Sequence, residues 1–217
     1  MQAADAKQRA GLVLVLSGPS GVGKTSLCRC IQAMLPEVTA AVSCTTRPPR
    51  PGERDGQDYH FLSPEAFDAH VAAGDFLEWA VVHGNRYGTL RQSVYERTAA
   101  GQDVLLTIDV QGAAHLRAAN LEAVYIFVLP PSLEVLAARL QQRGSETEAA
   151  RQRRLAVARE ELHHYTEYDY VVYNERLATA AETLRAIIIA ERHRVARLEQ
   201  VPLEGLRQCH PMCAPGA

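Results

Sequence analysis

The sequence lacks any apolar run long enough to cross a membrane. Its apolar stretches, such as residues 12–16 and 186–190, are far shorter than the roughly 18 residues that indicate a spanning helix. Residues 1–10 also lack the apolar segment that is typical of a secretory signal. We therefore expect no membrane partner and no export of the chain.

The sequence also lacks a strong excess of either charge. Its 23 Lys and Arg residues are balanced by 25 Asp and Glu residues, which gives a net charge of −2. This balance argues against a general nucleic-acid binder, which would need a basic surface. The 217 residues are 47% hydrophobic and 22% charged, an ordinary globular composition that excludes disorder for most of the chain. The length fits one large domain, or one core with small insertions.

Cysteine is scarce and odd in number, with five in the chain. This excludes a disulfide framework, and the chain is long enough to bury a core without one. Cys28 and Cys30 are expected to be small buried or half-buried thiols. Cys209, His210 and Cys213 could suggest a metal site, but no second ligand pair lies nearby. We therefore favour a loose tail there.

Apolar runs alternate with helical segments along most of the chain. The runs that predict buried strands cover residues 12–16, 38–43, 104–108, 124–129 and 170–173. Helices are predicted over 24–35, where Pro36 follows, and over 179–199. This alternation predicts an α/β fold with a parallel sheet flanked by helices and right-handed crossovers.

Two stretches interrupt the alternation. The predicted core covers 11–42, 102–138 and 155–195, and residues 43–101 are too long for a plain crossover, so we predict a small inserted domain there. An arginine-rich segment, 139–154, is the second interruption, and residues 1–10 and 201–217 are predicted to be flexible tails. Three helices are predicted to begin in the two interruptions. The first begins at Ser63-Pro64-Glu65 and ends at Gly74, and the second begins with a capping box at Thr89–Gln92 and ends at Gly101. The third begins with a capping box at Ser145–Glu148.

A glycine-rich turn follows the first predicted strand and precedes a predicted helix. It matches the pattern G-x-x-x-x-G-K followed by Ser or Thr, with the residues Gly18, Pro19, Ser20, Gly21, Val22, Gly23, Lys24 and Thr25. Its backbone N–H groups and the helix N-terminus favour phosphate oxygens. Lys24 is expected to reach the β- and γ-phosphates of ATP, and the Thr25 hydroxyl to bind Mg²⁺. The alternative is a glycine-rich turn with a surface lysine, which the strand–helix context disfavours.

Several other residues are candidates for a phosphate-transfer site. Asp109 ends an apolar strand, where a fold of this kind places an acid for Mg²⁺ or for the substrate. Arg47 and Arg50 lie three apart in a proline-stiffened loop, and their guanidinium groups suit bidentate phosphate contacts. The alternative for that pair is a solvated basic turn. Tyr59 and Tyr87 add phenolic donors, although a lone tyrosine is more often a core residue.

Glu78 stands among large apolar residues in Phe76-Leu77-Glu78-Trp79. A buried carboxylate needs donors. The Watson–Crick edge of guanine offers two adjacent donors, N1–H and the 2-amino group, whereas adenine offers an acceptor at N1. Without these neighbours, a salt-bridged surface acid would be the better interpretation of Glu78.

In combination these motifs resemble the guanylate kinase family of bacterial type. The resemblance covers about residues 11–195 and rests on segments 18–25, 43–53, 56–61, 76–79, 84–89, 108–112 and 143–148. It implies a P-loop NTPase fold in which 43–101 binds GMP and 139–154 is a lid. It also implies transfer of the ATP γ-phosphoryl group to GMP or dGMP, with Mg²⁺, in the cytoplasm.

The resemblance implies a role for individual residues of this sequence. The implied GMP-phosphate ligands are Arg47, Arg50, Tyr59 and Tyr87, and the implied guanine readers are Ser43, Glu78 and Thr89. Asp109 matches an acid that contacts GMP or the water shell of Mg²⁺, and both alternatives stay open. Catalysis is assigned to Lys24 and Arg47 with the lid arginines Arg139, Arg143 and Arg154. Asn174 matches a residue near the adenine, although Glu175-Arg176 departs from the acidic pair more common in the family.

Two other functions remain as alternatives. A guanylate-kinase-like module could bind phosphopeptides through the same Arg and Tyr residues, but such modules typically lack a working P-loop. A related P-loop kinase could act on a sugar phosphate, but it would not need Ser43 and Glu78 as base readers.

Overall fold

The computed structural model describes residues 10–82, 84–142 and 148–197 of the chain. Its core is a five-stranded sheet in which all neighbouring strands are parallel. In spatial order the strands are β2 (Val38–Ala40), β7 (Asp103–Thr107), β1 (Val13–Ser17), β8 (Val124–Leu129) and β9 (Tyr170–Tyr173). The predicted α/β fold with a parallel sheet is therefore confirmed.

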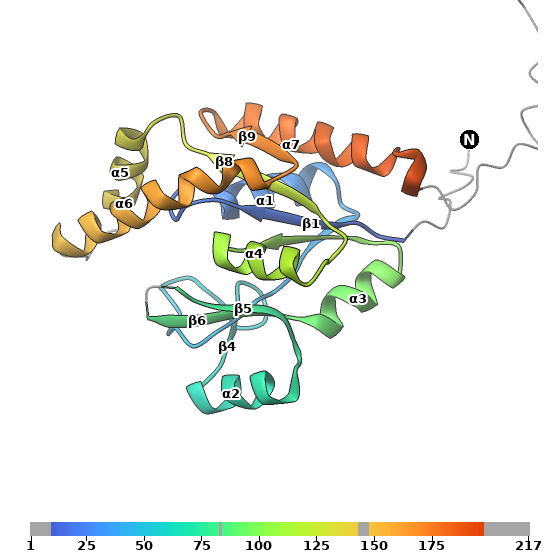
Figure 1. Ribbon diagram of the computed structural model, residues 1–217, viewed down its shortest axis with the longest axis horizontal. Helices are drawn as coiled ribbons and strands as arrows, with labels where there is room; N and C mark the ends of the chain where they lie inside the picture. Colours follow the sequence, from blue (N-terminus) through green and yellow to red (C-terminus); the bar gives the residue numbers. More distant parts are fainter. Residues whose placement is uncertain (1–9, 83, 143–147, 198–217) are drawn as a thin grey trace, which may run out of the picture.

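Helices cover both faces of this sheet (Figure 1). One face is covered by α1 (Lys24–Met34) and α7 (Leu177–Arg192), the other by α3 (Arg91–Ala99) and α4 (Val110–Ala118). Successive side chains of β1 point to opposite faces, as in any strand. Leu14 and Leu16 accordingly pack with the α1/α7 cluster, whereas Val13 and Val15 pack with the α3/α4 cluster. This explains why residues 13–16 of β1 are all apolar.

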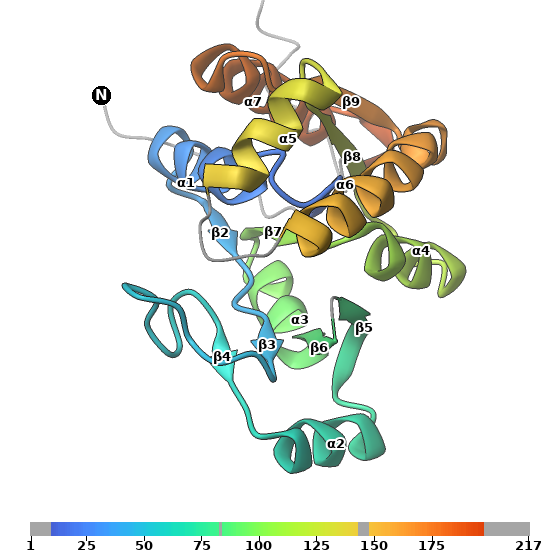
Figure 2. The same cartoon turned by 90° about the vertical axis from the view of Figure 1, so that its left-hand side faces the viewer.

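A second, smaller sheet lies beside the core (Figure 2). In spatial order it contains β4 (His60–Phe61), β3 (Cys44–Thr45), β6 (Asn85–Leu90) and β5 (Phe76–Val82), and α2 (Pro64–Ala73) belongs to the same unit. The Ser63 hydroxyl accepts a hydrogen bond from the Ala66 backbone N–H at 3.1 Å, and Gly74 ends α2 in a left-handed conformation. Both features were predicted from the sequence and both are confirmed.

Two further helices follow the strand β8. They are α5 (Leu133–Gln142) and α6 (Glu148–Leu162). The 3₁₀ turn η1 (His163–Glu167) follows α6 in the sequence, and a second 3₁₀ turn, η2 (Val195–Arg197), follows α7. Leu136 and Leu140 of α5 pack on Ala158 of α6 in a small apolar cluster of their own. The pair stands over the loop between β1 and α1 (Figure 2). It can therefore carry side chains to that loop.

The structure corrects three local predictions. β2 ends at Ala40 rather than at residue 43, because the chain leaves the core sheet after the Ala41 N–H bonds the Leu105 carbonyl at 3.1 Å. α1 ends at Met34, with Leu35 as its cap. α7 begins at Leu177 and ends at Arg192 rather than at residue 199. At this end of the helix, the Arg192 guanidinium binds the buried carboxylate of Asp103 at 2.7 Å.

The predicted capping box at Thr89–Gln92 is also wrong. α3 begins at Arg91 after Leu90, without a side-chain cap, because Thr89 is buried in β6 and its hydroxyl bonds elsewhere. The tail residues Cys209, His210 and Cys213 lie outside the described residues, as do Arg143 and Ser145.

Candidate active site

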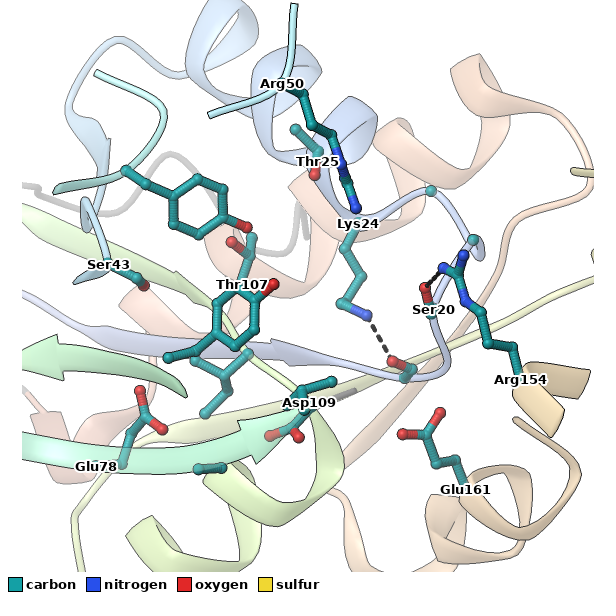
Figure 3. Close-up of a pocket in the computed structure, with 18 residues that line it drawn as sticks. Ser20, Lys24, Thr25, Ser43, Arg50, Glu78, Thr107, Asp109, Arg154 and Glu161 are labelled. Atoms are coloured by element: carbon teal, nitrogen blue, oxygen red, sulfur yellow. Dashed lines mark hydrogen bonds between the residues drawn. The ribbon is translucent and has the colours of Figure 1, made fainter. Parts of the chain in front are cut away.

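One pocket lies where the carboxyl ends of β1 and β7 face the second sheet (Figure 3). This edge of a parallel sheet is where α/β folds place ligands. The core contributes the glycine-rich loop, Thr107 and Asp109, and α6 contributes Arg154 and Glu161. The residues that line it from the side of the second sheet are Ser43, Arg50, Tyr59, Glu78, Ala80, Val82 and Tyr87. The pocket therefore brings together residues that are far apart in the sequence.

The glycine-rich loop curls directly into the N-terminus of α1. Gly23 caps the helix with a left-handed φ of 104°, a conformation that other residues rarely adopt. The Lys24 ammonium group donates to the carbonyl oxygens of Gly18 at 2.5 Å and Pro19 at 3.3 Å, so its side chain folds back across the loop. Thr25 lines the same pocket one residue further on. The loop thus has the concave shape that a phosphate group requires.

Asn174 and Arg139 lie behind this loop. The buried Asn174 amide donates to the Val22 carbonyl at 2.7 Å, and a Cβ on Gly23 would lie only 2.3 Å from the Asn174 amide nitrogen. Arg139 donates to the same Val22 carbonyl at 3.3 Å and to the Asn174 carbonyl at 3.1 Å. In this structure both side chains support the loop backbone.

Helix α6 supplies a cation and an acid to the pocket. Arg154 donates to the Ser20 hydroxyl at 2.8 Å, which places its guanidinium against the loop. Glu161 follows seven residues later, on the same face of the helix. Burial raises the pKa of Glu161 and Asp109 acts in the same direction, while Lys24 acts to lower it. The sequence reasoning missed Glu161, although the i, i+7 spacing from Arg154 would have pointed to it.

Glu78 is buried at the opposite end of the pocket, with 6% of its surface exposed. Its Oε1 accepts a hydrogen bond from the Thr89 hydroxyl at 2.7 Å, and the Ser43 hydroxyl lies 3.4 Å from that of Thr89. Burial raises the pKa of Glu78 to about 7, and Asp109 adds to this shift, whereas the Thr89 hydrogen bond opposes it. The three predicted base readers therefore lie together, around a carboxyl group that lacks a cationic partner among the described residues.

The predicted phosphate ligands divide into two groups. Arg50, Tyr59 and Tyr87 line the pocket, with the two tyrosine rings in edge contact at 6.0 Å between centroids. The Arg47 guanidinium instead donates to both carboxylate oxygens of Glu53 at 2.9 Å, and its carbon lies 5.4 Å from the centre of the Tyr59 ring. Arg47 thus adjoins the pocket residue Tyr59 while it is held by Glu53.

Asp109 lies between the two ends of the pocket and caps α4. Its Oδ1 accepts the Gly112 backbone N–H at 2.8 Å. Its Oδ2 is buried and has no hydrogen-bond partner within the described residues. A buried carboxylate oxygen without a partner is costly, so this atom is suited to a ligand, a metal ion or a metal-bound water.

The fold and the glycine-rich loop define a P-loop nucleotide-binding protein. Comparison with known families then identifies it further. The family model described as guanylate kinase matches residues 10–191, and the chain belongs to this family.

Named relatives resemble the chain over most of its length. It is 52% identical to a guanylate kinase of Symbiobacterium thermophilum, over 86% of this chain and 89% of that protein. It is 49% identical to one of Syntrophotalea carbinolica, over 88% and 91% respectively. The crystal structure of guanylate kinase from Anaplasma phagocytophilum superposes with a TM-score of 0.72 at 35% identity and covers 92% of this chain and 94% of that one. This agreement confirms the predicted family and fold.

No helix within the described residues is both long enough and apolar enough to cross a membrane.

Proposed function

We propose that this protein transfers the γ-phosphoryl group of ATP to GMP and releases ADP and GDP. One observation carries the proposal: a single pocket is lined at one end by the phosphate loop with Lys24 and at the other by the buried acid Glu78. Family membership supports the same reaction. We place this reaction in the cytoplasm, as part of purine nucleotide metabolism.

The acceptor base would be read by Glu78. Its carboxylate can accept hydrogen bonds from N1–H and the 2-amino group of guanine at the same time, and the Ser43 and Thr89 hydroxyls stand beside it. Adenine presents an acceptor at N1 and no 2-amino group, so it would leave the buried carboxylate without partners. This difference makes the pocket selective for guanine.

The acceptor phosphate would be held by Arg50 and the hydroxyl groups of Tyr59 and Tyr87, which line the pocket together. Arg47 would join them by exchanging Glu53 for the phosphate, since both anions match the guanidinium fork. No side-chain base is needed for this acceptor, because a phosphate monoester is already largely ionised near neutral pH.

The donor phosphates would lie on the backbone of residues 18–25, with Lys24 and Arg154 as counter-charges. The lid arginines Arg139 and Arg143 would add charge as the lid segment 139–154 closes. Two polyanions have to be brought into line for this reaction, so positioning and charge neutralisation supply most of the acceleration. Closure of the acceptor-binding insert 43–101 over the core would exclude water, which would otherwise hydrolyse ATP.

The residues present fit a magnesium ion. The Thr25 hydroxyl and the unpartnered Asp109 Oδ2 line the same pocket, and Mg²⁺ prefers oxygen ligands, often through water. Thr25 would bind the ion directly, and Asp109 would hold it through its water shell or contact GMP. When bound, the ion neutralises charge on the β- and γ-phosphates.

The alternative of a phosphopeptide-binding module is less well supported. Such a module would use the Arg and Tyr residues, but it would not need Lys24 folded over a phosphate loop or a buried Glu78. Both features are present, and both are explained by two nucleotide substrates.

The test is release of ADP from Mg·ATP with GMP, AMP, UMP or no acceptor at matched concentrations. We expect release that depends on GMP, with little from the other three reactions. Folded protein that binds GMP but releases no ADP would favour the binding module instead.

A further inference from the structure

Gly112 lies where helix α4 of the core packs against strand β5 of the second sheet. It lies in the first turn of α4, is buried, and donates its backbone N–H to Asp109. The carboxyl group of Glu78 also lies against it. Gly112 therefore adjoins both the acid at the base-reading end of the pocket and the acid at the phosphate end.

A side chain at this position would collide with Glu78 and lie tightly against Asp109. A Cβ on Gly112 would lie 2.6 Å from Glu78 Oε2, 3.3 Å from Glu78 Cδ and 3.2 Å from Asp109 Oδ1. The first of these distances is too short for any real carbon–oxygen contact, so the Glu78 carboxylate would have to move. All of the nearest atoms belong to pocket side chains, and none belongs to the backbone.

Backbone conformation does not explain the glycine. Gly112 is not among the residues with positive φ, and it lies inside a regular helix, where alanine is the more favourable residue. The atom that a methyl group would displace is the end of a flexible side chain. Alanine would therefore fit the helix and disturb the Glu78 carboxylate.

The Glu78 carboxylate is held from two sides. Thr89 binds Oε1 from β6 at 2.7 Å, and the bare backbone of Gly112 leaves room for Oε2. A methyl group that displaces Oε2 while Thr89 retains Oε1 would rotate the plane of the carboxylate. A base with two adjacent donors needs both oxygens in the plane of its ring, so this rotation would weaken two hydrogen bonds together.

From this geometry we propose that Gly112 is a positioning residue that determines base specificity, because its missing side chain sets the orientation of the Glu78 carboxylate. The proposal rests on the proposed function, since it specifies how GMP is selected. Gly112 itself touches neither the reacting phosphates nor Lys24 in this assignment. We therefore expect Gly112 to affect the recognition of the acceptor base and not the binding of ATP.

The first experiment compares Gly112→Ala with wild type and with Gln111→Ala, an exposed position in the same helical turn. The acceptors are GMP and IMP, which keeps N1–H but lacks the 2-amino group. In Gly112→Ala we expect kcat/KM for GMP to fall by about tenfold and the preference for GMP over IMP to shrink, as loss of one bidentate pair implies. The KM for ATP should equal the wild-type value and the melting temperature should not fall, and Gln111→Ala should match wild type.

The second experiment is a double-mutant cycle with Glu78→Asp, which shortens the carboxyl side chain and removes the collision. In that background we expect Gly112→Ala to cause little further loss of GMP affinity, so that the two effects are not additive. The double variant should also fold even if Gly112→Ala alone does not.

Three results would overturn the proposal: an unchanged preference for GMP over IMP in folded Gly112→Ala, additive losses in the cycle, or a double variant that does not fold. These results differ from failure of the proposed function. In that case wild type itself would release no GMP-dependent ADP.

Discussion

In the proposed function, the two ends of the pocket would recognise their ligands in different ways. The donor end is one continuous segment, residues 18–25, whose backbone N–H groups and helix N-terminus suit phosphate oxygens. The acceptor end is assembled from side chains that lie far apart in the sequence, among them Ser43, Glu78 and Thr89. A phosphate group can be bound by backbone alone, whereas a base must be distinguished from other bases by side chains.

The two ends also differ in their energetics. The phosphate loop contributes neutral backbone N–H donors, and Lys24 is its one ionised side chain. Glu78, in contrast, is an acid held away from water without a cation, and its pKa rises from 4.5 to about 7. In the proposed function, selectivity at this end would depend on a carboxylate that burial destabilises until the ligand binds. We expect variants at the donor end to reduce turnover and variants at the acceptor end to reduce base preference.

The largest effect is expected from Lys24→Ala. Removal of the one ammonium group of the loop should lower kcat by about 10²–10³-fold, the range for loss of one charge-stabilising donor. The ammonium group donates to the Gly18 and Pro19 carbonyls of its own loop, so we expect circular dichroism to show an intact fold. GMP affinity, measured by calorimetry, should change little. Near-normal turnover would contradict the assignment of the loop.

Glu78→Gln tests the acceptor end. The amide offers one acceptor and one donor where guanine needs two acceptors, so the Kd for GMP should rise by about tenfold or more while the KM for ATP is kept. The same substitution should increase the stability of the folded protein at high pH, although it weakens GMP binding. Because folding raises the pKa of Glu78, its contribution to the free energy of unfolding is present below pH 4.5 and is lost as pH rises through about 7.

The neutral glutamine avoids this loss. Glu78→Gln should therefore be more stable than wild type at pH 8, by at most about 3 kcal/mol for a shift of this size. Urea unfolding at pH 5 and pH 8 measures the difference. Equal stability of the two proteins at pH 8, together with unchanged GMP affinity, would exclude Glu78 from the base site.

The pH dependence of GMP binding is the third and smaller effect. Guanine needs the ionised carboxylate, so the Kd for GMP should rise as pH falls below about 7, by up to about tenfold per pH unit. The GMP phosphate also titrates near this range. Glu78→Gln shares that titration and serves as the control, and the difference between the two profiles isolates Glu78. Parallel profiles would contradict the raised pKa.

The smallest effect is expected from Asn174→Ala. Its amide supports the Val22 carbonyl behind the phosphate loop and contacts no pocket residue on the acceptor side. Loss of this buried hydrogen bond should lower the free energy of unfolding by about 1–3 kcal/mol and raise the KM for ATP a few-fold, with KM for GMP unchanged. A specific loss of discrimination between ATP and GTP, without loss of stability, would instead favour a role at the adenine.

Local sequence patterns predicted those features that local forces produce. The apolar run before the glycine-rich turn predicted β1 and the loop, and Ser63 with Pro64 predicted the start of α2. Thr89 shows where such a pattern fails. Its spacing from Gln92 fits a capping box, but a buried carboxyl group on the neighbouring strand takes its hydroxyl instead.

The sequence by itself determined the fold class, the phosphate loop and the family, because each is encoded in short contiguous segments with their own backbone preferences. Only the tertiary structure decided that Arg139 and Asn174 support the loop, that Arg47 is held by Glu53, and that Glu161 enters the pocket. The reason is physical: the partner and burial of a long polar side chain depend on which distant segments pack beside it. The role of Gly112 was also decided by the tertiary structure, since it follows from the approach of Glu78 on β5 to helix α4.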